Sequence, residues 1–368
     1  MSNKLKPLII GDLEIKVPII QGGMGVRVST APLAAAVANC GGGGTIASVG
    51  LPPDTEENRF DVPKSCREHL ESEIKRAREL SDGAIGVNIM VALSNYEDMV
   101  RTTVKAKADY IISGAGLPIS LPEFAEGSST KLIPLIASAR GAKLLLKTWK
   151  RRYNRFPDAF VVEGPLSGGH IAGYSLEELK SLKGRMRDKP LLENSVRDVL
   201  ELVREYEKEY NVSIPVIPAG GIFDGKDAAK FLKMGAGGVQ IGTRFIATIE
   251  CSAADAFKQL YVDSNEEDLV FIQSPVGMPA KVIRTKFLDD ILRGERKEFD
   301  CNYQCLRTCD PNTVQYCIAK ALINAVEGDI DNAVVFAGTN VSKIKKIVSV
   351  KELMDEITAE TIEELNKE

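Results

Sequence analysis

Short apolar segments alternate with amphipathic segments along most of the chain. In the amphipathic segments, apolar residues return at steps of three and four, which predicts helices. The apolar segments have the length of strands and carry Val, Ile and Ala with little alternation, as parallel strands buried on both faces do. The predicted strands are 18–24, 43–48, 84–90, 110–115, 131–137, 159–165, 215–221 and 237–245. The predicted helices among them include 31–39, 66–80, 96–107, 141–152 and 227–234.

Eight such repeats predict an α/β fold, and they favour a closed (β/α)8 TIM barrel over an open doubly wound sheet. The chain has 368 residues, whereas a typical barrel has roughly 250. We therefore expect a barrel domain over 1–262 with an insertion after strand six at 175–211, and a C-terminal extension over 263–368 that is partly helical. The insertion either covers the barrel mouth or is a solvated surface segment.

Charge and composition narrow the classes of partner. Lys and Arg number 47 and Asp and Glu 51, so the net charge is -4, which favours neither nucleic acid nor an anionic membrane as a partner. The first ten residues contain only a short apolar run, too short for a signal peptide or a membrane span. The seven cysteines do not form the even framework of a secreted protein. We expect a cytoplasmic protein with reduced thiols.

Glycines end the seventh and eighth predicted strands. Gly220 and Gly221 end one strand, and Gly242 and Thr243 end the other. Missing side chains let backbone N–H groups approach an anion, and a following helix adds its positive N-terminal end. In (β/α)8 barrels the phosphate site commonly follows strands seven and eight. The pattern therefore predicts a bound phosphorylated ligand, and the alternative is that these glycines only form tight turns.

His170 is the candidate catalytic residue. The chain has only two histidines, and this one follows the sixth predicted strand in a glycine-rich loop, at the end of the barrel where catalytic groups collect. His69 lies in a charged helix, and we assign it to the surface.

Small and polar residues end the first, third and fourth predicted strands, and they leave room for a flat ring at the barrel mouth. Gln21 and Asn88 can hydrogen-bond to the edge of a ring, and Met24 and Met90 can pack on its face or belong to the core.

These residues resemble the nitronate monooxygenase (2-nitropropane dioxygenase) family of FMN-dependent (β/α)8 barrels, which includes the flavin-dependent enoyl-acyl-carrier-protein reductases of bacteria. The resemblance runs from about 17 to 245 and continues weakly through Ser274-Pro-Val-Gly-Met-Pro-Ala280. Its motifs are Ile20-Gln-Gly-Gly-Met24, Gly86-Val-Asn-Ile-Met90, Gly114-Ala-Gly116, Glu163-Gly164 with Ser167-Gly-Gly-His170, Ala219-Gly-Gly221 and Gln240-Ile-Gly-Thr-Arg-Phe245.

The resemblance implies that FMN is the cofactor, that its phosphate lies on the two glycine turns, and that His170 is catalytic. The residues it assigns to cofactor binding are Gln21, Gly22, Gly23, Met24, Asn88, Gly114, Glu163, Ser167, Gly168, Gly169, Ala219, Gly220, Gly221, Gln240, Gly242 and Thr243.

The preferred activity is oxidation of an alkyl nitronate with O2 to a carbonyl compound and nitrite. The alternative is NAD(P)H-dependent reduction of an enoyl thioester through the same flavin, and a second alternative is a barrel that binds a phosphorylated ligand without redox chemistry. Gly22-Gly23-Met24 and Leu166-Ser-Gly-Gly-His170 depart from many nitronate monooxygenases and look more like the reductase branch.

Four cysteines lie close together in the extension, at 301, 305, 309 and 317. Thiolates at such intervals can bind zinc or an iron–sulfur cluster, but the usual signatures have two-residue gaps. Cysteines four apart on a helix simply share a face. We expect no metal here and favour unligated thiols, which could lie in a homo-oligomer contact.

Overall fold

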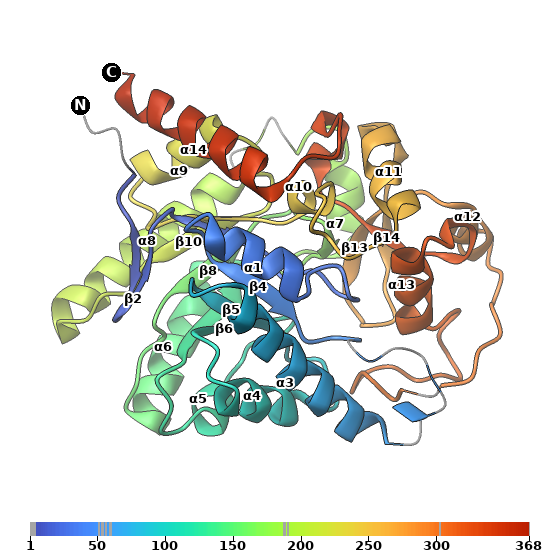
Figure 1. The fold of residues 1–368 in the computed structure, drawn as a ribbon, viewed down its shortest axis with the longest axis horizontal. Coiled ribbons are helices and arrows are strands. Elements are labelled where there is room, and N and C mark those ends of the chain that lie inside the picture. Colours follow the sequence, from blue (N-terminus) through green and yellow to red (C-terminus); the bar gives the residue numbers. More distant parts are fainter. Residues whose placement is uncertain are drawn as a thin grey trace.

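The fold is seen in a computed structural model (Figure 1). The structure describes residues 5–50, 52, 55, 57–58, 61–186, 189, 191–301 and 303–367. In this part of the chain no helix is both long enough and apolar enough to cross a membrane.

Eight parallel strands form the central sheet, which has the order β3-β11-β10-β8-β7-β6-β5-β4. An isolated parallel bridge between Ile20 and Gly43 joins the two edge strands and closes the barrel. The predicted (β/α)8 barrel is therefore confirmed, and each strand falls within its predicted range. The strands are β3 (Ile19–Gln21), β4 (Gly44–Ala47), β5 (Ile85–Met90), β6 (Tyr110–Gly114), β7 (Lys131–Ile136), β8 (Phe160–Glu163), β10 (Val216–Ala219) and β11 (Val239–Ile241).

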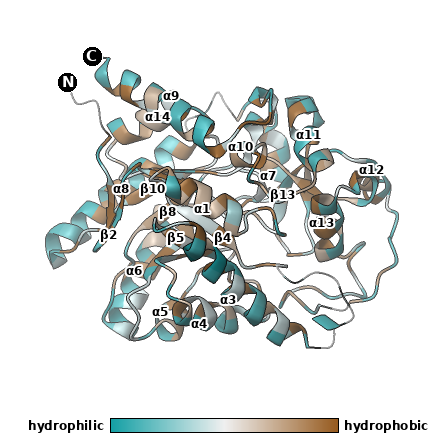
Figure 2. Ribbon diagram, in the orientation of Figure 1, coloured by the Kyte–Doolittle hydropathy of each residue, from teal (hydrophilic) through white to brown (hydrophobic). Residues whose placement is uncertain are grey.

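Helices surround this sheet because each has one apolar face to bury. Figure 2 shows hydrophilic residues along α3 and α8, on the outside of the molecule. The helices that follow the strands are α1 (Ala31–Asn39), α3 (Val62–Leu80), α4 (Tyr96–Lys105), α5 (Leu121–Phe124), α6 (Ala139–Tyr153), α8 (Leu191–Tyr210) and α9 (Gly225–Lys233).

Helix α8 lies within the predicted 175–211 insertion, but it is the crossover helix between β8 and β10. It buries Val196, Val199 and Val203 and contacts both strands. The chain beyond the regular repeat is therefore limited to α7 (Leu176–Leu182) and its flanks. Helix α7 packs on β12 of the extension.

A hairpin of two short strands, β1 (Leu8–Ile10) and β2 (Leu13–Ile15), precedes the barrel and was not predicted. Its residues Leu8, Ile10 and Ile15 share a buried cluster with Ile112 and Ile217 from inside the barrel. The hairpin therefore closes the interior at the end opposite the functional mouth, because Leu8 also approaches Gly238, just before β11 begins.

The extension contains a small sheet as well as helices. Strand β13 pairs antiparallel with β12, β14 and β9, and β9 belongs to the loop after β8. In that pairing Ala280 lies opposite His170, and Lys281 lies opposite Gly169. The remaining α-helices and strands of the described chain are β9 (Gly169–His170), α10 (Thr243–Ile246), α11 (Asp255–Asp263), β12 (Leu269–Gln273), β13 (Pro279–Ile283), α12 (Lys286–Leu292), α13 (Ile318–Glu327), β14 (Val335–Phe336) and α14 (Val350–Asn366).

Helix α14 returns from the extension to the barrel. Ser349 caps it by accepting a hydrogen bond from Glu352 N at 3.1 Å. It packs on α9 and α1, and Figure 1 shows it alongside α9. Glu360 Oε2 accepts from Gly225 N at 2.9 Å, which fixes α14 to the start of α9. Helix α14 thus completes the outer ring, although it lies beyond the predicted domain boundary near 262.

Candidate active site

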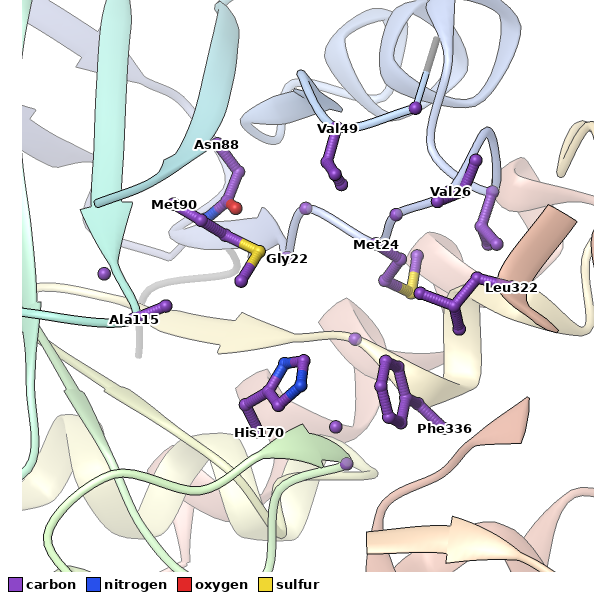
Figure 3. Close-up of a pocket in the computed structure, with 18 of the residues that line it drawn as sticks. Gly22, Met24, Val26, Val49, Asn88, Met90, Ala115, His170, Leu322 and Phe336 are labelled. Atoms are coloured by element: carbon purple, nitrogen blue, oxygen red, sulfur yellow. The ribbon is translucent and has the colours of Figure 1, made fainter. Parts of the chain in front are cut away.

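A cavity of about 330 Å³ lies at the carboxyl ends of the barrel strands, and the extension forms one of its walls. Figure 3 shows His170 facing Gly22 and Met24 across this cavity, with Phe336 beside it. Apart from Gln21, all the predicted site residues line it: Gly22, Gly23, Met24, Asn88, Gly114, Glu163, Ser167, Gly168, Gly169, His170, Ala219, Gly220, Gly221, Gln240, Gly242 and Thr243. Among the described residues of 175–211, none lines it.

The two glycine turns lie next to each other, because Ala219 of β10 is the register partner of Gln240 of β11. Gly220 and Gly221 both have a φ of +89°, a conformation that residues with side chains rarely adopt. A Cβ on Gly220 would lie 2.8 Å from Gly164 O, and one on Gly221 would lie 2.8 Å from Leu166 Cβ. These positions require glycine, and the turns form a cup bordered by backbone groups.

The first backbone donors of helix α9, which follows the first glycine turn, are already paired within the protein. Asp224 Oδ1 accepts hydrogen bonds from Lys226 N and Asp227 N, and Gly225 N donates to Glu360. Side-chain carboxylates thus already occupy the donors of this helix terminus. An anion in the cup would depend on the glycine turns themselves.

The extension seals the cup from the other side. Thr243 Oγ1 accepts a hydrogen bond from Gly338 N at 3.0 Å, and Asn340 Nδ2 donates to Gly221 O at 2.7 Å. Gly338 and Asn340 also line the cavity. Sequence reasoning missed both residues, since they lie about a hundred positions from the residues that they contact and in no recognisable motif.

At the strand ends opposite the cup, the backbone packs closely against neighbouring side chains. A Cβ on Gly23 would lie 2.2 Å from Asn88 Cβ, so only glycine fits over this side chain. Gln21 is fully buried beneath this turn. Its Oε1 accepts from Thr45 N at 3.0 Å and its Nε2 donates to Gly22 O. Gln21 therefore holds the turn in place from below.

Three buried side-chain oxygens in the described chain have no hydrogen-bond partner and also line this cavity: Ser48 Oγ, Ser167 Oγ and Gln240 Oε1. Buried polar atoms are normally paired, so oxygens left without partners around one cavity indicate a ligand with polar edges. Together with the glycine cup, they fit a ligand that has a phosphate at one end and a polar, planar ring at the other.

His170 lies on β9, above this cavity. Its Nε2 is 2.8 Å from Ser274 Oγ, and its ring meets Phe336 edge to face with centroids 5.0 Å apart. Burial lowers the pKa of His170 to about 4. The imidazole is therefore neutral at neutral pH.

Ser274 holds the imidazole through its hydroxyl group. Ser274 Oγ accepts a hydrogen bond from Val276 N at 3.3 Å, and its own hydrogen can be donated to His170 Nε2. In the tautomer in which Nε2 accepts this hydrogen, Nδ1 carries the proton and is a neutral N–H donor. Sequence reasoning did not single out Ser274, although it opens the weakly matching 274–280 motif.

Glu163 lines the cavity, and the buried Lys281 lies near it. Burial raises the pKa of Glu163 to about 8, and the positive charge of Lys281 opposes this shift. Lys281 Nζ donates to Pro165 O at 2.8 Å and to Thr339 Oγ1 at 2.6 Å. Lys281 therefore connects the loop that carries His170 to the segment that seals the cup.

This fold and this site define a (β/α)8-barrel oxidoreductase. The chain belongs to the nitronate monooxygenase family, whose model matches residues 6–107 and 94–360. Proteins of this family are generally flavin-dependent.

The proteins that are similar to this chain are named for different activities. A (3aS,4S,5R,7aS)-5-hydroxy-7a-methyl-1-oxo-octahydro-1H-indene-4-carboxyl-CoA dehydrogenase of Mycobacterium tuberculosis is 29% identical over 286 residues, which are 77% of this chain and 67% of the relative. A probable nitronate monooxygenase of Staphylococcus saprophyticus is 27% identical over 308 residues, 77% of this chain and 80% of the relative. The solved structure of FabK from Thermotoga maritima is similar with a TM-score of 0.70 and 29% identity, over 96% of this chain and 95% of that one.

Proposed function

We propose that this chain is an FMN-dependent enzyme that oxidises alkyl nitronates with O2 to carbonyl compounds and nitrite. The observation that carries the proposal is the position of His170, a neutral imidazole on the same cavity as the paired glycine turns. Bound FMN would supply the electron transfer between the substrate and O2.

The residues of the chain have distinct roles in this proposal. The backbone at Gly220, Gly221 and Gly242 holds the phosphate, and the partnerless oxygens of Ser167 and Gln240 accept hydrogen bonds from the cofactor. His170 donates its Nδ1 hydrogen to an oxygen of the nitro group, which orients the substrate and stabilises negative charge on it.

Enoyl thioester reduction by NAD(P)H is a second candidate, and a specific feature favours it. The extension adds apolar residues to the cavity wall, among them Ile318, Leu322 and Ile323. An apolar wall suits the chain of an acyl group, whereas a small nitronate does not need it. The likeness to FabK over 96% of this chain and the relative named as a carboxyl-CoA dehydrogenase also support this candidate. In this case the His170 N–H would donate to the thioester carbonyl oxygen.

The two candidates are separated by the behaviour of the purified protein. We expect a yellow protein whose absorption persists anaerobically with NADH or NADPH, and which releases nitrite from an alkyl nitronate in air. Rapid anaerobic bleaching by either nicotinamide, without nitrite release in air, would instead establish the reductase.

The His170→Ala variant tests the role of the imidazole. It should remain yellow and lose about 10²- to 10⁴-fold in turnover, the usual contribution of a positioned acid or base. Wild-type turnover in this variant would refute the role. A colourless wild-type protein that takes up no added FMN would instead support a binding barrel without redox chemistry.

A further inference from the structure

The four cysteines of the extension lie in a long segment without regular structure. Helix α12 ends at Leu292 and helix α13 begins at Ile318, and the described residues between them form only an isolated bridge, from Leu306 to Leu93. Segments of this length inside a compact protein are uncommon unless they bind something or are functional. Few backbone contacts, such as Ser94 N to Cys305 O at 3.1 Å, attach it to the barrel.

The four thiols lie near one another. Cys301, Cys305, Cys309 and Cys317 are all partly buried, and none forms a disulfide. Burial, followed by the charges of Cys317, Cys309 and Cys301 in that order, raises the pKa of Cys305 to about 12. Since each of the other three thiols acts on Cys305, the four form one group in space and not only in sequence.

The thiols as they stand do not form a site for a single metal ion. Among the described residues, no three His, Cys, Asp or Glu side chains lie close enough together to hold a single metal ion. Tetrahedral zinc requires four thiolates about 2.3 Å from the same atom, so the thiols as they stand do not form a zinc site. An iron–sulfur cluster distributes its four thiolates over different iron atoms linked by sulfide, and therefore holds them farther apart.

We propose that Cys301, Cys305, Cys309 and Cys317 ligate an iron–sulfur cluster at the edge of the active-site cavity. Each thiol loses its proton and forms one sulfur–iron bond, and no change of oxidation state is needed for binding. The cluster would fix the irregular segment in place of secondary structure. Cys305 also lines the cavity, so the cluster would stand against its wall.

The sequence spacing alone favours unligated thiols, because it lacks the two-residue gaps of common cluster motifs. The structure weakens the argument for unligated thiols in two ways. It shows that the segment carrying the thiols is not one continuous helix, so the four-residue spacing does not reflect a shared helix face. It also places Cys317 at the N-cap of α13, so the helix begins only after the last of the four thiols.

The test is anaerobic purification of the full chain, followed by measurement of iron, acid-labile sulfide and zinc. We expect iron and sulfide in equal amounts, about two or about four of each per chain. Dithionite should bleach a broad absorption beyond the flavin bands. Protein without iron that also fails to take up iron and sulfide on anaerobic reconstitution would overturn the proposal, as would zinc bound in its place.

Variants locate the cluster. Cys305→Ser and Cys309→Ser should each lose most of the iron, whereas Cys40→Ser, a matched change at the end of α1 outside this segment, should keep it. Should the first two variants fail to fold, alkylation of the wild-type protein decides the question. The four thiols should be protected until a chelator removes the iron, while Cys40 reacts in both states. Equal labelling of all five would contradict the proposal. The flavin spectrum of the same samples tests the proposed function separately.

Discussion

His170 Nε2 and Ser274 Oγ lie 2.8 Å apart, although 104 positions separate them in the chain. His170 belongs to the loop after barrel strand β8, and Ser274 belongs to the turn between β12 and β13 of the extension. The pairing of β9 with β13 brings these two parts together. The orientation of the imidazole therefore depends on both the barrel and the extension.

Ser274→Ala should reduce turnover by roughly 10-fold without loss of flavin. The variant removes the hydroxyl that holds the imidazole in its orientation, and one hydrogen bond of this kind contributes roughly 1 kcal/mol. Steady-state kinetics and the flavin absorption of the same preparation measure the two effects. Ser274→Thr, which keeps the hydroxyl, should recover most of the activity. Equal activity in the Ala and Thr variants would exclude a positioning role.

Turnover should fall on the acid side only at a pH well below the ordinary pKa of histidine. Burial lowers the pKa of His170 to about 4, so the imidazole stays neutral as the pH falls through about 6.5. The ratio of wild-type to His170→Ala turnover should therefore be constant from pH 8 down to about 5 and fall only near pH 4. A break in this ratio near 6.5 would show that the imidazole is exposed to water.

Gly221→Ala should weaken flavin binding by at least about 10-fold, because the new methyl would lie 2.8 Å from Leu166 Cβ, on a backbone with a φ of +89°. Gly127→Ala is a matched control. Its φ is +74°, but nothing lies within 4 Å of the added methyl, so it introduces only the backbone strain, about 1 kcal/mol. Titration of flavin-free protein with FMN compares the two, and equal affinities would argue against the proposed cup.

Glu163→Gln should change how stability depends on pH. The pKa of Glu163 is raised by burial to about 8 in the folded state, above the ordinary value of 4.5. Between these values the folded chain keeps a proton that the unfolded chain has released, so this group destabilises the fold as the pH rises from 4.5 to 8. Denaturant unfolding at pH 5 and pH 8 should show a smaller loss of stability in the variant. An unchanged loss would mean that Glu163 ionises normally.

The barrel follows from local pattern, and the sequence predicts it well. Helix 31–39 matches to the residue, and the eight strands all lie inside their predicted ranges. The hairpin at Leu8–Ile15 escaped prediction because strands of three residues are too short to show a period. The glycines at 220 and 221 were recognisable since their residue type itself reports the required backbone geometry.

The parts of the site that sequence reasoning missed come from distant segments. Ser274, Lys281 and Asn340 contact the barrel through single hydrogen bonds to residues roughly a hundred positions away. Their local sequences carry no period or motif that specifies the partner. Such contacts depend on how the small sheet of the extension docks, which only the tertiary structure reveals.

Helix α14 has a consequence for how this enzyme could be divided or shortened. It completes the ring between α9 and α1, yet it follows the whole extension in the chain. A truncation near residue 262 would therefore leave the faces of α9 and α1 uncovered and expose apolar surface to water. The extension that forms one wall of the active-site cavity is therefore attached to the barrel at both of its ends. Changes within the extension can alter the choice of substrate while both attachments stay in place.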